Sequence, residues 1–205
     1  MNVLSMLARL QATLDRTDLV RQMLLIPSRA LEMSSAGAVN LVVGYSGSAK
    51  SQAALDLTLW IAHQTKIATT QPVTVQVVYV AEEPKVTSWS RSTHRTTGRT
   101  SVLAMPEKPS VSQEALDRVT QFEQADRILW QARCLAEEWR GALKTHLRFG
   151  QVGLQLLEVA YAEEASLLIL GCESSQNTLV RQLSQRGSDL PFSVLGIPRM
   201  DETDC

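Results

Sequence analysis

The chain has few cysteines and no long apolar run. Its three cysteines, Cys134, Cys172 and Cys205, are scattered and lack CxxC spacing, which favours reduced thiols over a disulfide framework or a zinc site. No apolar run approaches the ~20 residues that a membrane-spanning helix needs, so no membrane span is predicted. The first ten residues lack the small-residue cleavage site of a secretory signal. We therefore expect a cytoplasmic protein.

An excess of charge of one sign is also missing, because 20 Lys and Arg stand against 21 Asp and Glu. This balance argues against a protein built around a polyanion, so no specific nucleic acid is predicted. The histidines His63, His94 and His146 share no metal-ligand spacing, and no metal site is predicted. The chain is 44% hydrophobic and 20% charged, a composition typical of globular proteins that disfavours wholesale disorder or a coiled-coil rod.

From residue 39 onward, strand-like and helix-like segments alternate. Apolar and β-branched runs predict strands over 39–44, 73–80, 143–149, 167–171 and 193–197. Helical spacing predicts helices over 48–64, 112–140, 152–164 and 178–185. This alternation predicts an α/β fold with a doubly wound five-stranded parallel sheet. Ligands of such sheets bind beyond the carboxyl ends of the strands, so the segments after Gly44, Val80, Phe149 and Gly171 are the candidate site.

Two segments lie outside this pattern, and they divide the chain into regions. Residues 1–38 form a predicted helical extension and linker, with an apolar stripe in its first half and a second helical run over 18–26 that Pro27 ends. Residues 39–200 form the α/β domain. A long loop over 85–111, inserted after the second strand, carries five basic residues against Glu107 alone. Residues 201–205 form an acidic tail.

The loop that follows the first strand, Gly44–Ser51, has more than one interpretation. In the simplest interpretation the loop is a strand-to-helix turn that Ser48 caps and that needs no ligand. It also matches a phosphate-binding P-loop at Gly44, Lys50 and Ser51, although Ala49 replaces the second glycine and no aspartate ends a later strand. It is further similar to the S-G-G-x-D-S loop of ATP pyrophosphatases, from which it departs at Lys50.

A third resemblance covers the whole domain. The segment Leu41–Leu55 (LVVGYSGSAKSQAAL) resembles the opening of universal stress protein domains, in which a strand runs into a turn and an Ala-Leu helix. The later landmarks of that family follow in order at Val77–Val80, Phe149–Val152, Leu167–Gly171 and Pro191–Pro198. The N-terminal extension and the basic loop lie outside the resemblance, and they are similar to those of cyanobacterial members.

The resemblance implies an adenine-nucleotide site, for ATP or another adenine nucleotide, in a non-catalytic regulatory stress or signalling protein. It implies an adenine near Val80 and a ribose and phosphates near the first and fourth strands. The residues it assigns to the site are Gly44, Tyr45, Ser46, Gly47, Val80, Gly171, Ser174 and Ser184. Ser46 replaces the acidic group of the family and Ser174 replaces a glycine. No general base is evident in either loop, so no catalytic residue is predicted, and weak ATP hydrolysis stays open.

Further predictions concern the assembly of the chain, its partners and several single residues. A homodimer is predicted through the apolar last strand, Phe192–Ile197. The alternative function is a nucleotide-free interaction module that binds a protein partner through residues 1–38 or the 85–111 loop. His63 is predicted to cap a helix end. Trp130 and Trp139 are predicted to be core or helix-packing residues, and Cys172 to be an inert thiol.

Overall fold

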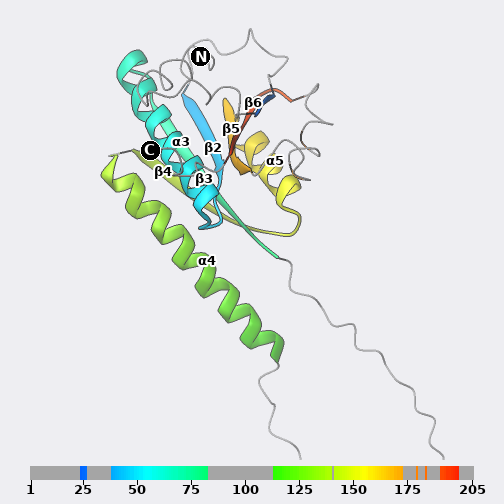
Figure 1. The fold of residues 1–205 in the computed structure, drawn as a ribbon. Coiled ribbons are helices and arrows are strands. Elements are labelled where there is room, and N and C mark those ends of the chain that lie inside the picture. The colour runs from blue at the N-terminus through cyan, green and yellow to red at the C-terminus, as the bar shows by residue number, and fades with distance from the viewer. Residues whose placement is uncertain are drawn as a thin grey trace, which may run out of the picture.

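The computed structural model describes residues 24–26, 38–82, 113–139, 141–172, 179, 183 and 190–198 (Figure 1). The helices are α3 (Ala49–Thr69), α4 (Gln113–Glu138) and α5 (Val152–Ala162). The strands are β1 (Leu24–Ile26), β2 (Val39–Gly44), β3 (Val73–Ala81), β4 (Ala142–Phe149), β5 (Leu167–Cys172) and β6 (Ser193–Pro198). The short helix predicted over 178–185 and the basic loop lie outside the described residues, apart from two single positions of the former.

The strands form one sheet in the order β1-β6-β5-β2-β3-β4. All pairings among β2 to β6 are parallel, which confirms the predicted doubly wound sheet of five parallel strands. The chain passes from β2 to β3 and β4 on one side of β2, and then crosses to β5 and β6 on the other side. The strand order therefore reverses at β2, where neighbouring crossovers leave a crevice at the carboxyl ends.

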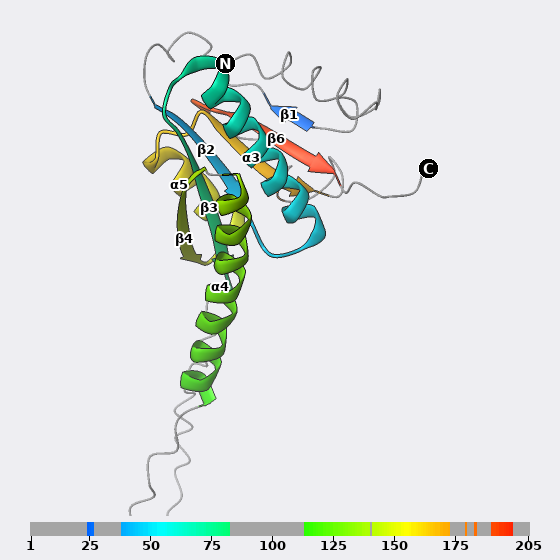
Figure 2. The ribbon, with the colours of Figure 1, turned by 90° about the vertical axis from the view of Figure 1, so that its left-hand side faces the viewer.

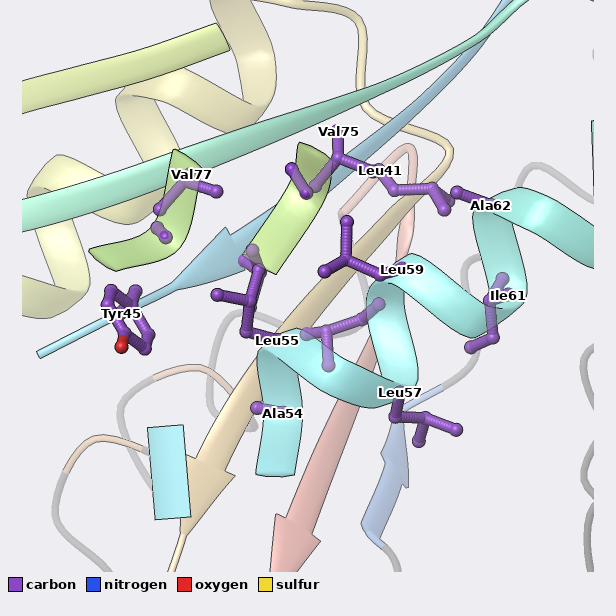
Figure 3. Packing of buried hydrophobic residues seen from close by; sticks show 14 of the residues in the cluster. Leu41, Tyr45, Ala54, Leu55, Leu57, Leu59, Ile61, Ala62, Val75 and Val77 are labelled. Carbon is purple, nitrogen blue, oxygen red and sulfur yellow. The ribbon is translucent and has the colours of Figure 1, made fainter. Parts of the chain in front are cut away.

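Helices cover both faces of the sheet (Figure 2). Leu41, Val43 and Val75 belong to the apolar cluster under α3 and α4, which Figure 3 shows from close by. Val42 and Leu168, which alternate with them along the strands, belong to the cluster under α5. Because both faces of these strands are buried, their sequences are continuous apolar runs rather than alternating ones.

The N-terminal extension contributes a sixth strand, so the helix predicted over 18–26 is wrong at its end. β1 pairs antiparallel with β6, and Leu25 lies opposite Leu195. Ile26 is half-buried and packs against the cluster under α5. The outer edge of β6 offers unpaired backbone groups, and an extended segment satisfies them where a helix would not. The homodimer through the last strand stays a prediction, and at 194–196 that outer edge is already paired within the chain.

The prediction for His63 and the core interpretation of Trp130 are also wrong. α3 continues to Thr69, five residues past the predicted end, and Thr70 closes it in a left-handed conformation with φ of 56°. His63 therefore lies inside the helix, where its ring meets Trp139 edge-on at 5.8 Å between centroids. Trp139 packs against the core as predicted. Trp130, in contrast, is 61% exposed, because it lies on the face of α4 turned away from the sheet.

A polar network fastens the end of α5 to the sheet. Gln76 is buried on β3, and its Nε2 donates to Glu163 Oε2 at 2.8 Å. The Gln76 Oε1 meets His146 Nε2 at 2.8 Å, and Lys144 Nζ lies 3.2 Å from the same Glu163 oxygen. Asn40 Nδ2 donates to the Glu163 carbonyl at 2.7 Å. Because each buried polar group has a partner, the network orients α5 over β3 and β4 without leaving an unsatisfied amide.

Candidate functional site

A pocket of about 300 Å³ opens at the carboxyl ends of β2, β3 and β5. It lies at the reversal of strand order, as the sequence predicts. Its polar lining comes from the β2–α3 turn and the first turn of α3: Tyr45, Ser46, Ser48, Lys50 and Ser51. The rest of the lining comes from the strand ends, from α5 and from residue 179: Gly44, Val78, Tyr79, Val80, Val152, Leu156, Leu170, Gly171 and Leu179.

Glycines at two strand ends allow the elements around the pocket to approach closely. A Cβ atom on Gly171 would lie 2.5 Å from the backbone carbon and oxygen of Lys50. A Cβ atom on Gly44 would lie 3.1 Å from Leu170 Cδ2 and 3.3 Å from two carbons of Leu156. Glycine at 171 therefore lets the first turn of α3 rest directly on the end of β5, and this contact places Lys50 at the pocket.

Three serine hydroxyls gather at the start of α3. Ser48 is the N-cap residue, and its Oγ accepts a hydrogen bond from the Ser51 backbone N–H at 3.3 Å. The Ser51 hydroxyl donates to the Ser48 carbonyl at 2.9 Å and accepts from the Ser46 backbone N–H at 3.1 Å. Ser46 Oγ lies 3.1 Å from Ser48 Oγ and 3.3 Å from Ser51 Oγ. The cluster fixes the turn and presents hydroxyls and the positive end of a helix dipole to the pocket.

Tyr45 connects the β2–α3 turn to helix α3 through a hydrogen bond with Gln52. Its ring is buried, and its hydroxyl donates to Gln52 Oε1 at 2.8 Å. Burial raises the pKa of the Tyr45 phenol, and the nearby Asp56 raises it further. Burial likewise raises the pKa of Asp56. A neutral phenol tied to an amide holds the turn in place and does not serve as a base at neutral pH.

The structure brings together five of the eight predicted site residues. Gly44, Tyr45, Ser46, Val80 and Gly171 all line the pocket. Gly47 belongs to the same turn, with φ of 77°, but it packs toward Ile128 of α4 and does not line the pocket. The predicted residues Ser174 and Ser184 lie outside the described residues.

The sequence predictions missed several lining residues. Lys50 is not among the predicted site residues and enters the sequence predictions only through the comparisons with the P-loop and the pyrophosphatase loop, although its position in the first turn of α3 brings it to the pocket. Val152 and Leu156 come from the first turns of α5, one turn apart. Their i, i+4 spacing directly after a strand could have identified an apolar wall, because helices that follow parallel strands begin at the same edge of the sheet.

Other potential chemistry is sparse in the described part of the chain. No group of three metal-ligating residues occurs there, and no helix in it is long and apolar enough to cross a bilayer. Cys172 follows the pocket residue Gly171 but is buried, and burial raises the pKa of its thiol, while Lys50 opposes that shift. A buried thiol of raised pKa is a weak nucleophile, in agreement with the prediction for Cys172.

No family model and no curated protein matches the chain, whereas solved structures do. A universal stress protein family member from Burkholderia pseudomallei is 19% identical with a TM-score of 0.52, over 78% of this chain and 95% of that one. A hypothetical protein, itself the subject of a structure-based assignment of function, is 15% identical with a TM-score of 0.55, over 80% and 98%. An Arabidopsis thaliana universal stress protein family protein with AMP bound is 13% identical with a TM-score of 0.51, over 81% and 95%. The described domain therefore has the fold of universal stress proteins.

Proposed function

We propose that this protein is a non-catalytic regulatory protein of the stress or signalling type that binds an adenine nucleotide in the pocket beyond β2, β3 and β5. The observation that carries the proposal is the division of the pocket lining. Its positive charge and its serine hydroxyls come from the β2–α3 turn and the first turn of α3, and most of its apolar groups come from the ends of β3 and β5 and from α5. A nucleotide has the same two parts, an anionic phosphate and a flat base with apolar faces.

The polar side of the pocket suits a phosphate group. Lys50 contributes a positive charge, and the N-terminal end of α3 adds the dipole of a 21-residue helix. Backbone N–H groups and hydroxyls at a helix start are well suited to bind phosphate oxygens. We therefore expect the phosphate beside Ser46, Ser48 and Lys50.

The opposite side of the pocket suits the base. Val80, Val152 and Leu156 offer aliphatic surface on which an adenine ring can pack. The fold similarity to the Arabidopsis protein with AMP bound supports this class of ligand.

The proposal of a non-catalytic role rests on the side chains around the pocket. Among the described lining residues the groups that can titrate are Tyr45, Lys50 and Tyr79, and the Tyr45 phenol is held by Gln52. Hydrolysis of a phosphate ester needs a positioned base or a metal-bound water. The described lining supplies neither a carboxylate nor an imidazole, so we expect binding without turnover.

Calorimetric titration with AMP, cyclic AMP, ADP and ATP tests the proposal. We expect saturable binding of at least one nucleotide, and Lys50→Ala is expected to weaken it about tenfold through loss of a charge-assisted contact. Lys66→Ala, in the last turn of the same helix, is the matched control and should bind like the unaltered protein. The absence of binding at millimolar nucleotide, or equal affinity in the two lysine variants, would contradict the proposal.

A further inference from the structure

Helix α4 exposes an unusual amount of apolar surface. Four of the eight large apolar side chains that are exposed in the described residues lie on it: Leu116, Val119, Phe122 and Trp130. The N-terminal half of α4 extends past the ends of β3 and β4 (Figure 1, Figure 2). Phe122 meets Phe149 of β4 edge-on, with 5.6 Å between the ring centroids. Single exposed apolar residues need no explanation, but the concentration of Leu116, Val119 and Trp130 on one helix marks an interaction surface.

Exposed residues on the face of α4 turned away from the sheet follow a regular spacing. The core-facing residues are Ala125, Ile128, Leu129, Ala132 and Ala136. On the other side, steps of four and three residues connect an exposed row, which we call the outer row: Leu116, Thr120, Glu123, Arg127, Trp130 and Cys134. Steps of alternately four and three residues are the spacing at which one helix packs along another. The row extends over about 27 Å, at 1.5 Å per residue.

We propose that the outer row is a dimer interface, at which α4 packs antiparallel against α4 of a second copy of this chain around a two-fold axis beside residue 125. The antiparallel arrangement places Glu123 opposite Arg127 of the second copy. Leu116 then lies opposite Cys134 of the second copy, and Thr120 opposite Trp130. The two-fold axis repeats each of these layers, so the interface is closed.

Charge complementarity selects both the partner and the direction. In a parallel pair, Glu123 would oppose Glu123 and Arg127 would oppose Arg127, and like charges at such positions destabilise a helix pair. In the antiparallel pair each of these charges faces one opposite charge, and the two-fold axis makes two such Glu123–Arg127 pairs. The helix dipoles also favour antiparallel packing. Charged layers at the centre contribute register more than affinity, whereas Trp130 and Leu116 supply the apolar contact.

One flanking residue acts against the pair and provides a test. Asp126 is exposed beside the outer row, close to the proposed axis, so it approaches Asp126 of the second copy. Arg127 of the second copy lies close to both carboxylates and offsets part of their repulsion. Asp126→Asn is therefore expected to tighten the dimer, while a surface that plays no part in assembly would show no change.

Charge exchange tests the interface in solution by sedimentation equilibrium. Glu123→Arg and Arg127→Glu should each weaken the dimer about tenfold or more, and the double variant should recover most of the loss. Glu158→Arg, exposed on α5 on the opposite face of the sheet, is the control and should associate like the unaltered chain. A chain that stays monomeric up to about 0.5 mM, or a dimer indifferent to both single changes, would overturn the proposal.

A disulfide trap tests the register independently. Leu116→Cys should oxidise to a covalent dimer with native Cys134 of the second copy, because opposing positions bring the Cα atoms within about 7 Å. Both side chains are exposed, so the change should leave the fold intact. Leu154→Cys on α5 should form no such dimer. Peptide mapping that finds a 116–134 disulfide supports the antiparallel register, whereas a 116–116 disulfide, or none, contradicts it.

Discussion

Gly171 lies so close to the backbone of Lys50 that a methyl group at position 171 would sit 2.5 Å from the Lys50 carbonyl carbon and oxygen. A flexible side chain can move away from such a contact, but the first turn of a helix cannot do so without carrying its neighbours along. The end of β5 and the start of α3 are therefore positioned by each other. The turn that would have to move carries the polar lining of the pocket.

Gly171→Ala is expected to destabilise the fold by about 1–3 kcal/mol, because overpacking forces the backbone of α3 to shift. Nucleotide affinity should fall in the same variant, since Lys50 moves with that turn. Urea denaturation and calorimetric titration measure the two effects. Gly141→Ala is the matched control: no atom lies within 4 Å of a Cβ there, and the change should be neutral or slightly stabilising. Equal stability of the two variants would refute the close contact.

The serine cluster predicts unequal effects of two similar changes. Ser48→Ala removes the N-cap acceptor of the Ser51 N–H and should lower the free energy of unfolding by about 0.5–2 kcal/mol. Ser46→Ala removes only contacts between hydroxyls, and its effect should remain within about 0.5 kcal/mol. Chemical denaturation of both variants checks the order. A larger loss for Ser46→Ala would show that the cap is not formed by Ser48.

The polar network beneath α5 predicts a pH-dependent contribution to stability. Burial lowers the pKa of His146; Glu163 opposes this shift, and Arg148 and Lys144 add to it. In the unfolded chain the ring regains its ordinary pKa of about 6.5. Between the lowered pKa of the folded state and this value, the unfolded chain therefore binds a proton that the folded protein does not. The contribution of His146 is thus complete above about pH 7 and is lost as the pH falls through 6.5 toward the lowered pKa.

The variant His146→Gln isolates that contribution. It keeps a donor for Gln76 Oε1 but cannot titrate, so unfolding free energies of variant and unaltered protein should converge or cross as the pH falls from about 7.5 to 5.5. His63→Gln, exposed on α3, is the control. A constant difference between His146→Gln and the unaltered protein over this range would contradict the prediction.

The pairing of β1 with β6 predicts that loss of β1 exposes a sheet edge. Deletion of residues 1–35 removes Leu24–Ile26, which covers 194–196, and should leave the parallel sheet folded while raising self-association. Ile26→Asp should have a smaller effect of the same sign, because it places a charge against the cluster under α5. Light scattering and circular dichroism measure assembly and folding. Unchanged assembly after the deletion would argue against a protective role for β1.

Most of the fold could be predicted from the sequence because its central strands are buried on both faces. Such strands require unbroken β-branched and apolar runs, and β2 has its predicted bounds while β3 and β6 each extend one residue further. β1 could not be predicted, since a three-residue strand shows no period and its apolar run suits a helix equally well. The exposure of Trp130 follows from helical spacing, because it lies on the side of α4 away from the buried residues Leu129 and Ala132; its large apolar side chain suggested burial instead.

The residues of the candidate site that lie at strand ends could be predicted, whereas those on the helices could not. Parallel strands end at one edge, so residues such as Gly44, Val80 and Gly171 meet there whatever the helices do. The contribution of Lys50 depends on how closely α3 approaches β5, and that of Val152 and Leu156 on how α5 lies over the sheet. Both are set by tertiary packing and the Glu163 network, which a single sequence does not display.

The short strand β1 also affects how the sheet can pair with sheets of other molecules. A parallel sheet with two open edges can be extended head to tail, because β4 of one molecule can pair with β6 of the next without limit. In this protein the β6 edge is closed over 194–196 by a strand of opposite direction. The edge that remains there is a three-residue strand running against the others, and a short edge strand is a poor template for pairing with another molecule. We therefore expect β1 to oppose open-ended extension of the sheet on this side.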